Sequence, residues 1–133
     1  MKTKTSELTG PALDWAVAKC EGIPVTLWCK RLWLNAVEQY GHFVDGKESM
    51  AFEPSTSWAQ GGPIIEREKI RIEPWNSGEI AWAATAYDGI AFDQDGDMVE
   101  KRTWAPTPLI AAMRCYVASK LGDEIDIPEE LMK

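Results

Sequence analysis

The chain has 133 residues, of which 45% are hydrophobic and 26% are charged. This balance suits one globular domain and excludes a disordered or collagen-like chain. The formal net charge of -7 argues against binding to long nucleic acid, because phosphate backbones attract proteins with a surplus of Lys and Arg. No apolar run reaches the length of a membrane span, and residues 1–10 lack the apolar centre of a secretory signal. We therefore expect a cytoplasmic protein.

The reactive side chains do not form a recognisable catalytic or metal-binding pattern. Cys20, Cys29 and Cys115 are far apart and include no C-x-x-C pair, so we interpret them as reduced thiols among apolar neighbours. His42 has no nucleophile or second histidine at a catalytic or zinc-binding spacing. The acidic run 93–97 resembles the start of a calcium loop but is followed by Met where that loop needs glycine. We expect no metal, no cofactor and no enzymatic activity.

Two main helices are predicted, over residues 10–21 and 108–121. The first stops at Gly22, a residue typical of helix ends, and the second starts after Thr107, a typical N-cap residue. The second helix is apolar on most of its sides, so we expect other elements to pack on more than one of them.

Alternating apolar and polar residues predict strands near residues 25–30, 69–74, 79–87 and 98–103. Asp88-Gly89 and Asp95-Gly96 are read as turns, so we expect a further hairpin formed by residues 90–92 and 98–102. We expect one small antiparallel sheet that packs against the two main helices, with short helical turns between, as a single α+β domain over residues 1–122. Residues 123–133 are rich in acids and are expected to form a solvated tail.

The segment Ser55 to Glu68, STSWAQGGPIIERE, is the strongest candidate for a binding site. We expect a short helical turn that carries Trp58, an interruption at Gly61-Gly62, and a second helix that starts at Pro63. Glycines allow backbone N–H groups to approach a ligand, and a helix N-terminus attracts anions. The alternative, which the local pattern alone favours, is a tight turn in which the glycines serve the backbone and Trp58 is part of the core.

If this segment forms a pocket, its lining is predicted to be Ser55, Thr56, Trp58, Gln60, Gly61 and Gly62, with Arg67 or Arg114 supplying positive charge. Arg114 lies on an otherwise apolar helix, where a buried charge needs an anionic partner. The alternative for Arg114 is an ion pair with Glu66 or another carboxylate that only braces the fold.

The seven tryptophans are many for a chain of this length. Trp82, on an alternating strand, is expected in the core. Trp33, Trp75 and Trp104 lie near polar or turn segments, where an indole can stack on a base or anchor a protein interface.

Three longer blocks carry a family resemblance: residues 4–18 (KTSELTGPALDWAVA), 54–66 (PSTSWAQGGPIIE) and 106–122 (PTPLIAAMRCYVASKLG). They resemble a phage- and prophage-encoded family of unknown function that is labelled NinX. The resemblance implies a small phage accessory protein made in the bacterial cytoplasm, and it implies no activity or catalytic residues.

Many small phage accessory proteins act by binding, either by sequestering a host defence signal or by blocking a host protein. Together with the candidate pocket, the resemblance favours a non-catalytic protein that binds a small anionic, nucleotide-derived ligand. The alternative is an inhibitor or modulator of a host protein, and self-association stays open.

Overall fold

Helices and strands alternate along the computed structural model, which describes residues 1–28, 31–34, 51–78, 80–92 and 98–132. The sequence features at Cys29, His42 and 93–97 lie outside the described residues. In chain order the elements are β1 (Lys2–Lys4), the 3-10 turn η1 (Thr5–Glu7), α1 (Gly10–Glu21), β2 (Val25–Trp28), β3 (Arg31–Leu34), α3 (Trp58–Glu68), β4 (Arg71–Ser77), β5 (Ile80–Phe92), β6 (Met98–Ala105), α4 (Pro108–Leu121), β7 (Glu124–Asp126) and the 3-10 turn η3 (Glu129–Met132).

The two main helices have the predicted bounds, since both are set by local signals. Helix α1 ends at Gly22, which adopts the left-handed conformation at φ 69°. The Thr107 hydroxyl accepts a hydrogen bond from the Ile110 N–H at the start of α4. The α+β fold class of the prediction is confirmed.

Helix α3 differs from the prediction, because it runs without a break from Trp58 to Glu68 and holds Pro63 inside it. Gly61 does not interrupt the helix, and its N–H donates to the Ser57 carbonyl at 2.8 Å. The side of α3 that carries Gly61 lies directly against other elements, so tertiary packing outweighs the low helix propensity of the glycines and proline.

The strands form three separate antiparallel sheets within the described residues, rather than one. Strand β2 pairs with β3, which follows it directly, and does not join the sheet of β4, β5 and β6. Pairing with a sequence neighbour closes a short loop and costs little chain entropy. The predicted turn at Asp88-Gly89 is also wrong, because β5 continues to Phe92 and absorbs the extra residues in a register shift against β6.

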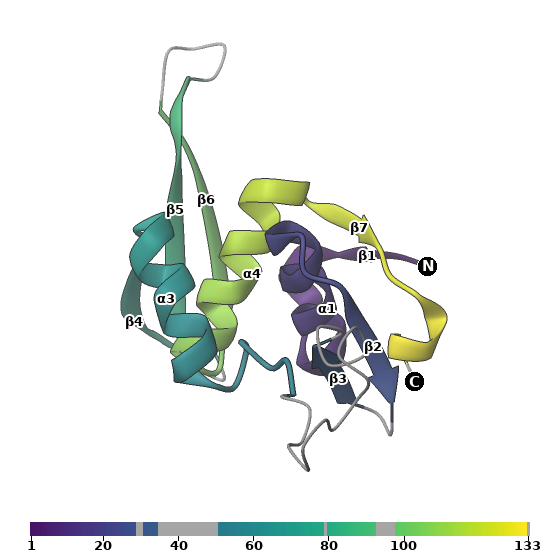
Figure 1. The fold of residues 1–133 in the computed structure, drawn as a ribbon. Helices are drawn as coiled ribbons and strands as arrows, with labels where there is room; N and C mark the ends of the chain where they lie inside the picture. The colour runs from purple at the N-terminus through teal and green to yellow at the C-terminus, as the bar shows by residue number, and fades with distance from the viewer. Residues whose placement is uncertain (29–30, 35–50, 79, 93–97, 133) are drawn as a thin grey trace.

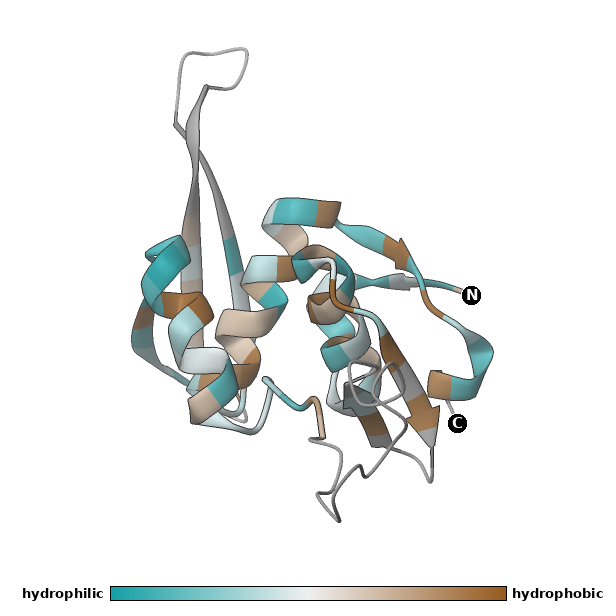
Figure 2. Cartoon of the chain, viewed as in Figure 1, coloured by the Kyte–Doolittle hydropathy of each residue, from teal (hydrophilic) through white to brown (hydrophobic). Residues whose placement is uncertain are grey.

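Helix α4 lies at the centre of the fold and packs on β5, β6, α1 and α3 (Figure 1). Figure 2 shows mainly pale and brown segments along α4, whereas teal gathers toward the C-terminal end of α3. The side chains of α4 that are buried come from several sides of the helix, as its sequence predicted: Leu109, Ala111, Ala112, Met113, Cys115, Tyr116, Val117 and Ala118. Trp82 packs against this core, also as predicted.

The C-terminal segment is not a solvated tail. Strand β7 pairs with β1, so the two ends of the chain lie side by side (Figure 1). Ile125 is 8% exposed and Ile127 is 1% exposed, while Glu124 and Asp126 point to solvent. The acids therefore occupy only the outer side of an alternating strand whose isoleucines join the core.

Candidate functional site

The segment that leads into α3 is tied to α1 by a buried carboxylate. The Ser55 N–H donates to Asp14 Oδ1 at 2.8 Å, and the two residues are 1% and 4% exposed. Burial raises the pKa of Asp14 to about 6, and the interactions with Ser55 oppose that shift. The Ser55 hydroxyl has no hydrogen-bond partner within the described residues. No local sequence pattern indicates this contact, because Asp14 lies 41 residues before Ser55.

Gln60 holds the same segment from the other side. Its Nε2 donates to the Ala51 carbonyl, and its Oε1 accepts from the Glu53 N–H, both at 2.8 Å. The Glu53 carbonyl in turn accepts from the Thr56 N–H at 3.1 Å. The amide oxygen and the amide nitrogen of Gln60 are therefore both hydrogen-bonded to backbone groups of this chain.

The two glycines of α3 have different surroundings. A Cβ on Gly61 would lie 2.5 Å from the Pro54 carbonyl oxygen and 2.6 Å from Leu109 Cδ1, whereas a Cβ on Gly62 would meet nothing within 4 Å. Trp58 is 55% exposed, so it is not a core residue. Gly61 thus serves close packing, while Trp58 and Gly62 face open space.

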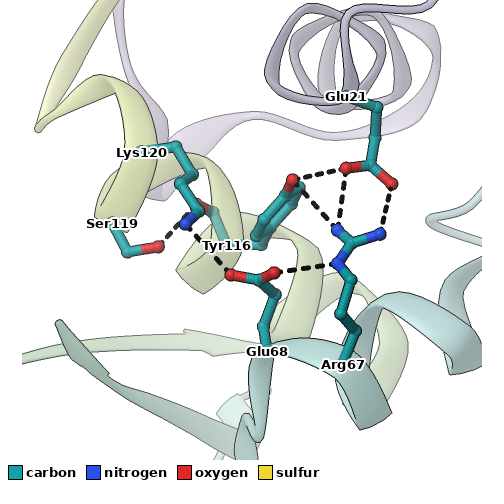
Figure 3. A network of polar contacts seen from close by, with 6 residues as sticks. All are labelled: Glu21, Arg67, Glu68, Tyr116, Ser119 and Lys120. Atoms are coloured by element: carbon teal, nitrogen blue, oxygen red, sulfur yellow. Dashed lines mark hydrogen bonds and ion pairs between the residues drawn. The ribbon is translucent and has the colours of Figure 1, made fainter. Parts of the chain in front are cut away.

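Arg67 lies at the other end of α3 and joins three helices (Figure 3). Its Nη1 and Nη2 donate to the two carboxylate oxygens of Glu21 at 3.0 and 2.8 Å, and its Nε donates to Glu68 at 2.9 Å. The Tyr116 hydroxyl accepts from Nη2 at 3.2 Å and donates to Glu21 at 2.6 Å. Lys120 completes the group through an ion pair with Glu68 at 3.1 Å.

These contacts change the acidity of the carboxylates. Partial burial favours a higher pKa for Glu21, but the hydrogen bonds from Arg67 and Tyr116 outweigh it and hold the pKa of Glu21 below its usual value. The hydrogen bond from Arg67 lowers the pKa of Glu68 in the same way. The guanidinium of Arg67 is therefore occupied by hydrogen bonds to Glu21, Glu68 and Tyr116.

Arg114 binds two backbone carbonyls rather than a carboxylate. Its Nε donates to the Leu8 carbonyl at 2.7 Å and its Nη1 donates to the Trp104 carbonyl at 2.8 Å. Partial burial lowers the pKa of this arginine. In place of the alternative ion pair with Glu66 or another carboxylate, these bonds join the residue after η1 and strand β6 to α4.

The structure thus gathers only part of the predicted site. The segment from Ser55 to Gly62 lies at the start of α3, whereas Arg67 lies nine residues beyond Trp58, about 13 Å along the axis of an α-helix. Arg114 projects from α4 toward the end of β6. Whether residues 55–62 bind a ligand stays a prediction.

A second group of side chains lies on the sheet of β4, β5 and β6, on the face turned away from α4. The strand register places Arg71, Thr85 and Arg102 in one row across the sheet, and Glu73, Ala83 and Trp104 in the next. Paired residues of antiparallel strands point to the same face. The neighbouring residues Ala84, Ala86 and Ala105 point the other way, into the core. We call the opposite face, which carries the two rows from Arg71 to Arg102 and from Glu73 to Trp104, the outer face of the sheet.

Trp75 joins Trp104 and Arg102 on the outer face. The two indole rings make an edge contact, with centroids 6.0 Å apart and planes at 66°, and they are 37% and 38% exposed. The Arg102 guanidinium carbon lies 5.9 Å from the Trp75 ring, and its Nε donates to the Thr85 hydroxyl at 3.2 Å. The sequence marked both tryptophans as candidates, and alternation along β6 could have added Arg102. The contacts of Trp104 and Arg102 with Trp75 depend on how the strands pair.

Comparison with known proteins identifies the family. The family model described as "Bacteriophage P22, NinX" matches residues 4–120. The chain belongs to the NinX family. This confirms the resemblance found in the sequence blocks, and it brings no established activity. No curated protein is similar enough in sequence to count as a match.

The fold of this NinX family member also occurs in a solved structure. A phage protein from Bacillus cereus ATCC 14579, determined at 2.0 Å, superposes with a TM-score of 0.53 and 12% sequence identity. The match covers 84% of this chain and 87% of the other. At this identity the likeness shows a shared fold.

The described residues of the NinX chain contain no group of three or more His, Cys, Asp or Glu that could hold a metal ion. Burial raises the pKa of Cys20 to about 11 and that of Cys115 to about 12, so both thiols stay protonated near neutral pH. A helix long and apolar enough to cross a membrane does not occur in the described parts of the chain.

Proposed function

We propose that this NinX family protein acts by binding rather than by catalysis, in the cytoplasm of the bacterial host. Its ligand is a small anionic molecule derived from a nucleotide, such as a host defence signal that the protein sequesters. The proposal needs two features in one place: an aromatic surface for a base and a positive group for a phosphate.

One observation carries this proposal: solvent-exposed indoles lie beside groups that carry positive charge or the positive end of a helix dipole. Trp58 is in the first turn of α3, whose N-cap residue Ser57 makes no side-chain capping bond, so the positive end of the helix dipole is not capped there. Trp75 lies beside the Arg102 guanidinium, and Trp104 contacts the Trp75 ring. In a protein of net charge -7, such places are where a small anion is least repelled.

A protein partner is the second candidate. Trp and Arg are enriched among the residues that contribute most to protein interfaces, and the outer face presents both, with the two tryptophans more than one-third exposed. A host protein that binds this face would make the protein an inhibitor or modulator.

The test is to express the protein in its bacterial host, purify it, denature it by heat and analyse the released small molecules by mass spectrometry. We expect a nucleotide-derived anion in near-stoichiometric amount. If no nucleotide is released and one host protein co-purifies instead, the order of the two candidates is reversed.

A further inference from the structure

The outer face of the β4–β5–β6 sheet has the form of a small platform. Ala83 and Thr85 of β5 are 0% exposed although they point outward, because Trp104 and Arg102 extend from the neighbouring strand β6 in the same rows. Small residues in the central strand thus leave room for large side chains to lie flat across the sheet. The large side chains that cover β5 are themselves exposed to solvent, with Trp75 and Trp104 more than one-third exposed.

The two indoles form a corner rather than a flat stack. Their planes meet at 66°, with 6.0 Å between the ring centroids. A planar heterocycle that stacks on one indole therefore meets the other at its edge, and aromatic rings favour both arrangements.

Arg102 supplies a positive charge next to this corner. Only its Nε donates a hydrogen bond within the described residues, to Thr85, so the two terminal nitrogens keep their donors. The Thr85 bond and the contact with the Trp75 ring fix the guanidinium in place. A positioned guanidinium with unused donors suits the oxygen atoms of a phosphate.

We propose that the outer face is the ligand site of this protein, and that it binds a nucleoside monophosphate unit, with the base against Trp75 and Trp104 and the phosphate at Arg102. This inference rests on the proposed function and gives it a location. The predicted segment at the start of α3 offers the exposed Trp58. However, the Gln60 amide is hydrogen-bonded to the backbone, Gly61 is packed against other elements, and Arg67 is bound to Glu21.

The other charges on the outer face refine the choice of ligand. Arg71 shares a row with Arg102, while Glu73 shares a row with Trp104. Two cations against one anion favour a ligand with a single phosphate over a long polyanion. Removing the Glu73 charge should therefore strengthen binding of the same ligand.

The experiment is isothermal titration of the full-length protein with the four ribonucleoside 5′-monophosphates, with adenosine and with inorganic phosphate. We expect the monophosphates to bind, with little preference among bases, and more tightly than adenosine or phosphate alone, because stacking tolerates every base. Trp75→Ala and Trp104→Ala should each weaken binding about tenfold or more. Arg102→Gln should reduce the affinity for the monophosphates to that for adenosine, and Glu73→Gln should increase it.

Trp58→Ala tests the other candidate location, the start of α3. If the ligand lies on the outer face, removing this exposed indole should weaken binding less than either outer-face tryptophan variant does. Thermal melts verify that each variant folds. If Trp104→Ala does not fold, the location is tested by the opposite changes in affinity that are expected for Arg102→Gln, a decrease, and for Glu73→Gln, an increase. Binding that is lost in Trp58→Ala but kept in the outer-face variants overturns the location and leaves the proposed function standing. The location is also overturned if no monophosphate binds although purified protein releases a nucleotide. If no monophosphate binds and the purified protein releases no nucleotide, the proposed function itself is wrong.

Discussion

At the scale of single residues, Gly61 and Gly62 are neighbours in helix α3, but only Gly61 is closely packed against other elements. Gly61 lies where the backbone before α3 and the first turn of α4 approach the helix most closely, whereas Gly62 faces open space. Glycine is therefore required at the first position for close approach, whereas no packing contact requires it at the second.

The pair makes a matched test by urea unfolding. Gly61→Ala should lower the free energy of unfolding by about 1–3 kcal/mol, because its methyl group must displace the Pro54 backbone and Leu109. Gly62→Ala should change the free energy by less than about 1 kcal/mol, since its methyl group meets no other element and the gain in helix propensity is opposed by the ring of Pro63, which follows it. Equal effects from both would show that α3 does not pack as described.

Asp14 is a second residue whose surroundings decide its chemistry. Burial raises its pKa to about 6, above the ordinary value of 3.8. The native state therefore binds a proton more readily than the unfolded chain does. The resulting stabilisation is fully present below about pH 4 and is lost as the pH rises through about 6.

Asp14→Asn should remove this dependence, because asparagine keeps an oxygen that can accept from the Ser55 N–H but carries no charge. Relative to wild type, the variant should gain about 2–3 kcal/mol of unfolding free energy between pH 4 and pH 7.5. Denaturant unfolding of both proteins across this range measures the gain. Parallel pH profiles would show that Asp14 does not titrate in the native protein.

At the scale of elements, the Arg67 network joins α1, α3 and α4 (Figure 3). Arg67 and Glu68 come from α3, Glu21 from the end of α1, and Tyr116 and Lys120 from α4. Arg67 is half-exposed, so each ion pair is screened by solvent and contributes little alone. The Tyr116 hydroxyl, which both donates and accepts, couples the groups to one another.

Tyr116→Phe should lower the free energy of unfolding by about 1 kcal/mol near pH 7, because Glu21 and Arg67 each lose a partner. Since the pKa values of Glu21 and Glu68 are held below 4.5, the network's contribution is present above that pH and fades as the pH falls through the folded values. Glu66→Gln, on the exposed side of α3, is the control and should have no comparable effect. A Tyr116→Phe cost that is as large at pH 3 as at pH 7 would contradict this explanation.

At the scale of the whole molecule, the two ends of the chain close the fold. The Met1 ammonium binds the Asp126 carboxylate at 2.6 Å and the Ile127 carbonyl at 3.0 Å, and β1 pairs with β7 alongside. Ile125 and Ile127 then enter the core that is shared by α1 and α4. The C-terminal segment is thus part of the domain.

Ile127→Ala should therefore lower the free energy of unfolding by about 2–5 kcal/mol, the cost of a cavity at a side chain that is 1% exposed. Glu124→Gln, an exposed change in the same segment, should leave it unchanged. Urea unfolding with intrinsic tryptophan fluorescence measures both. A tail that were merely solvated would tolerate either change equally.

The sequence by itself determined the features that depend on neighbours along the chain: the bounds of α1 and α4, the strands of the main sheet, and the NinX blocks. A cap, a glycine stop or an alternating strand acts over a few residues and leaves a local pattern. Acidic residues 123–130 misled the same reasoning, because composition concealed the alternation that buries Ile125 and Ile127.

Only the tertiary structure decided the features that depend on distant partners. Packing against Pro54 and Leu109 kept α3 continuous through its glycines, and three helices had to meet before Arg67 could be engaged by Glu21. Likewise, Trp75 and Arg102 became neighbours only when β4 and β6 paired on either side of β5. The reason is physical: such contacts join residues that no local pattern links, and they form only when hydrophobic burial brings their elements together.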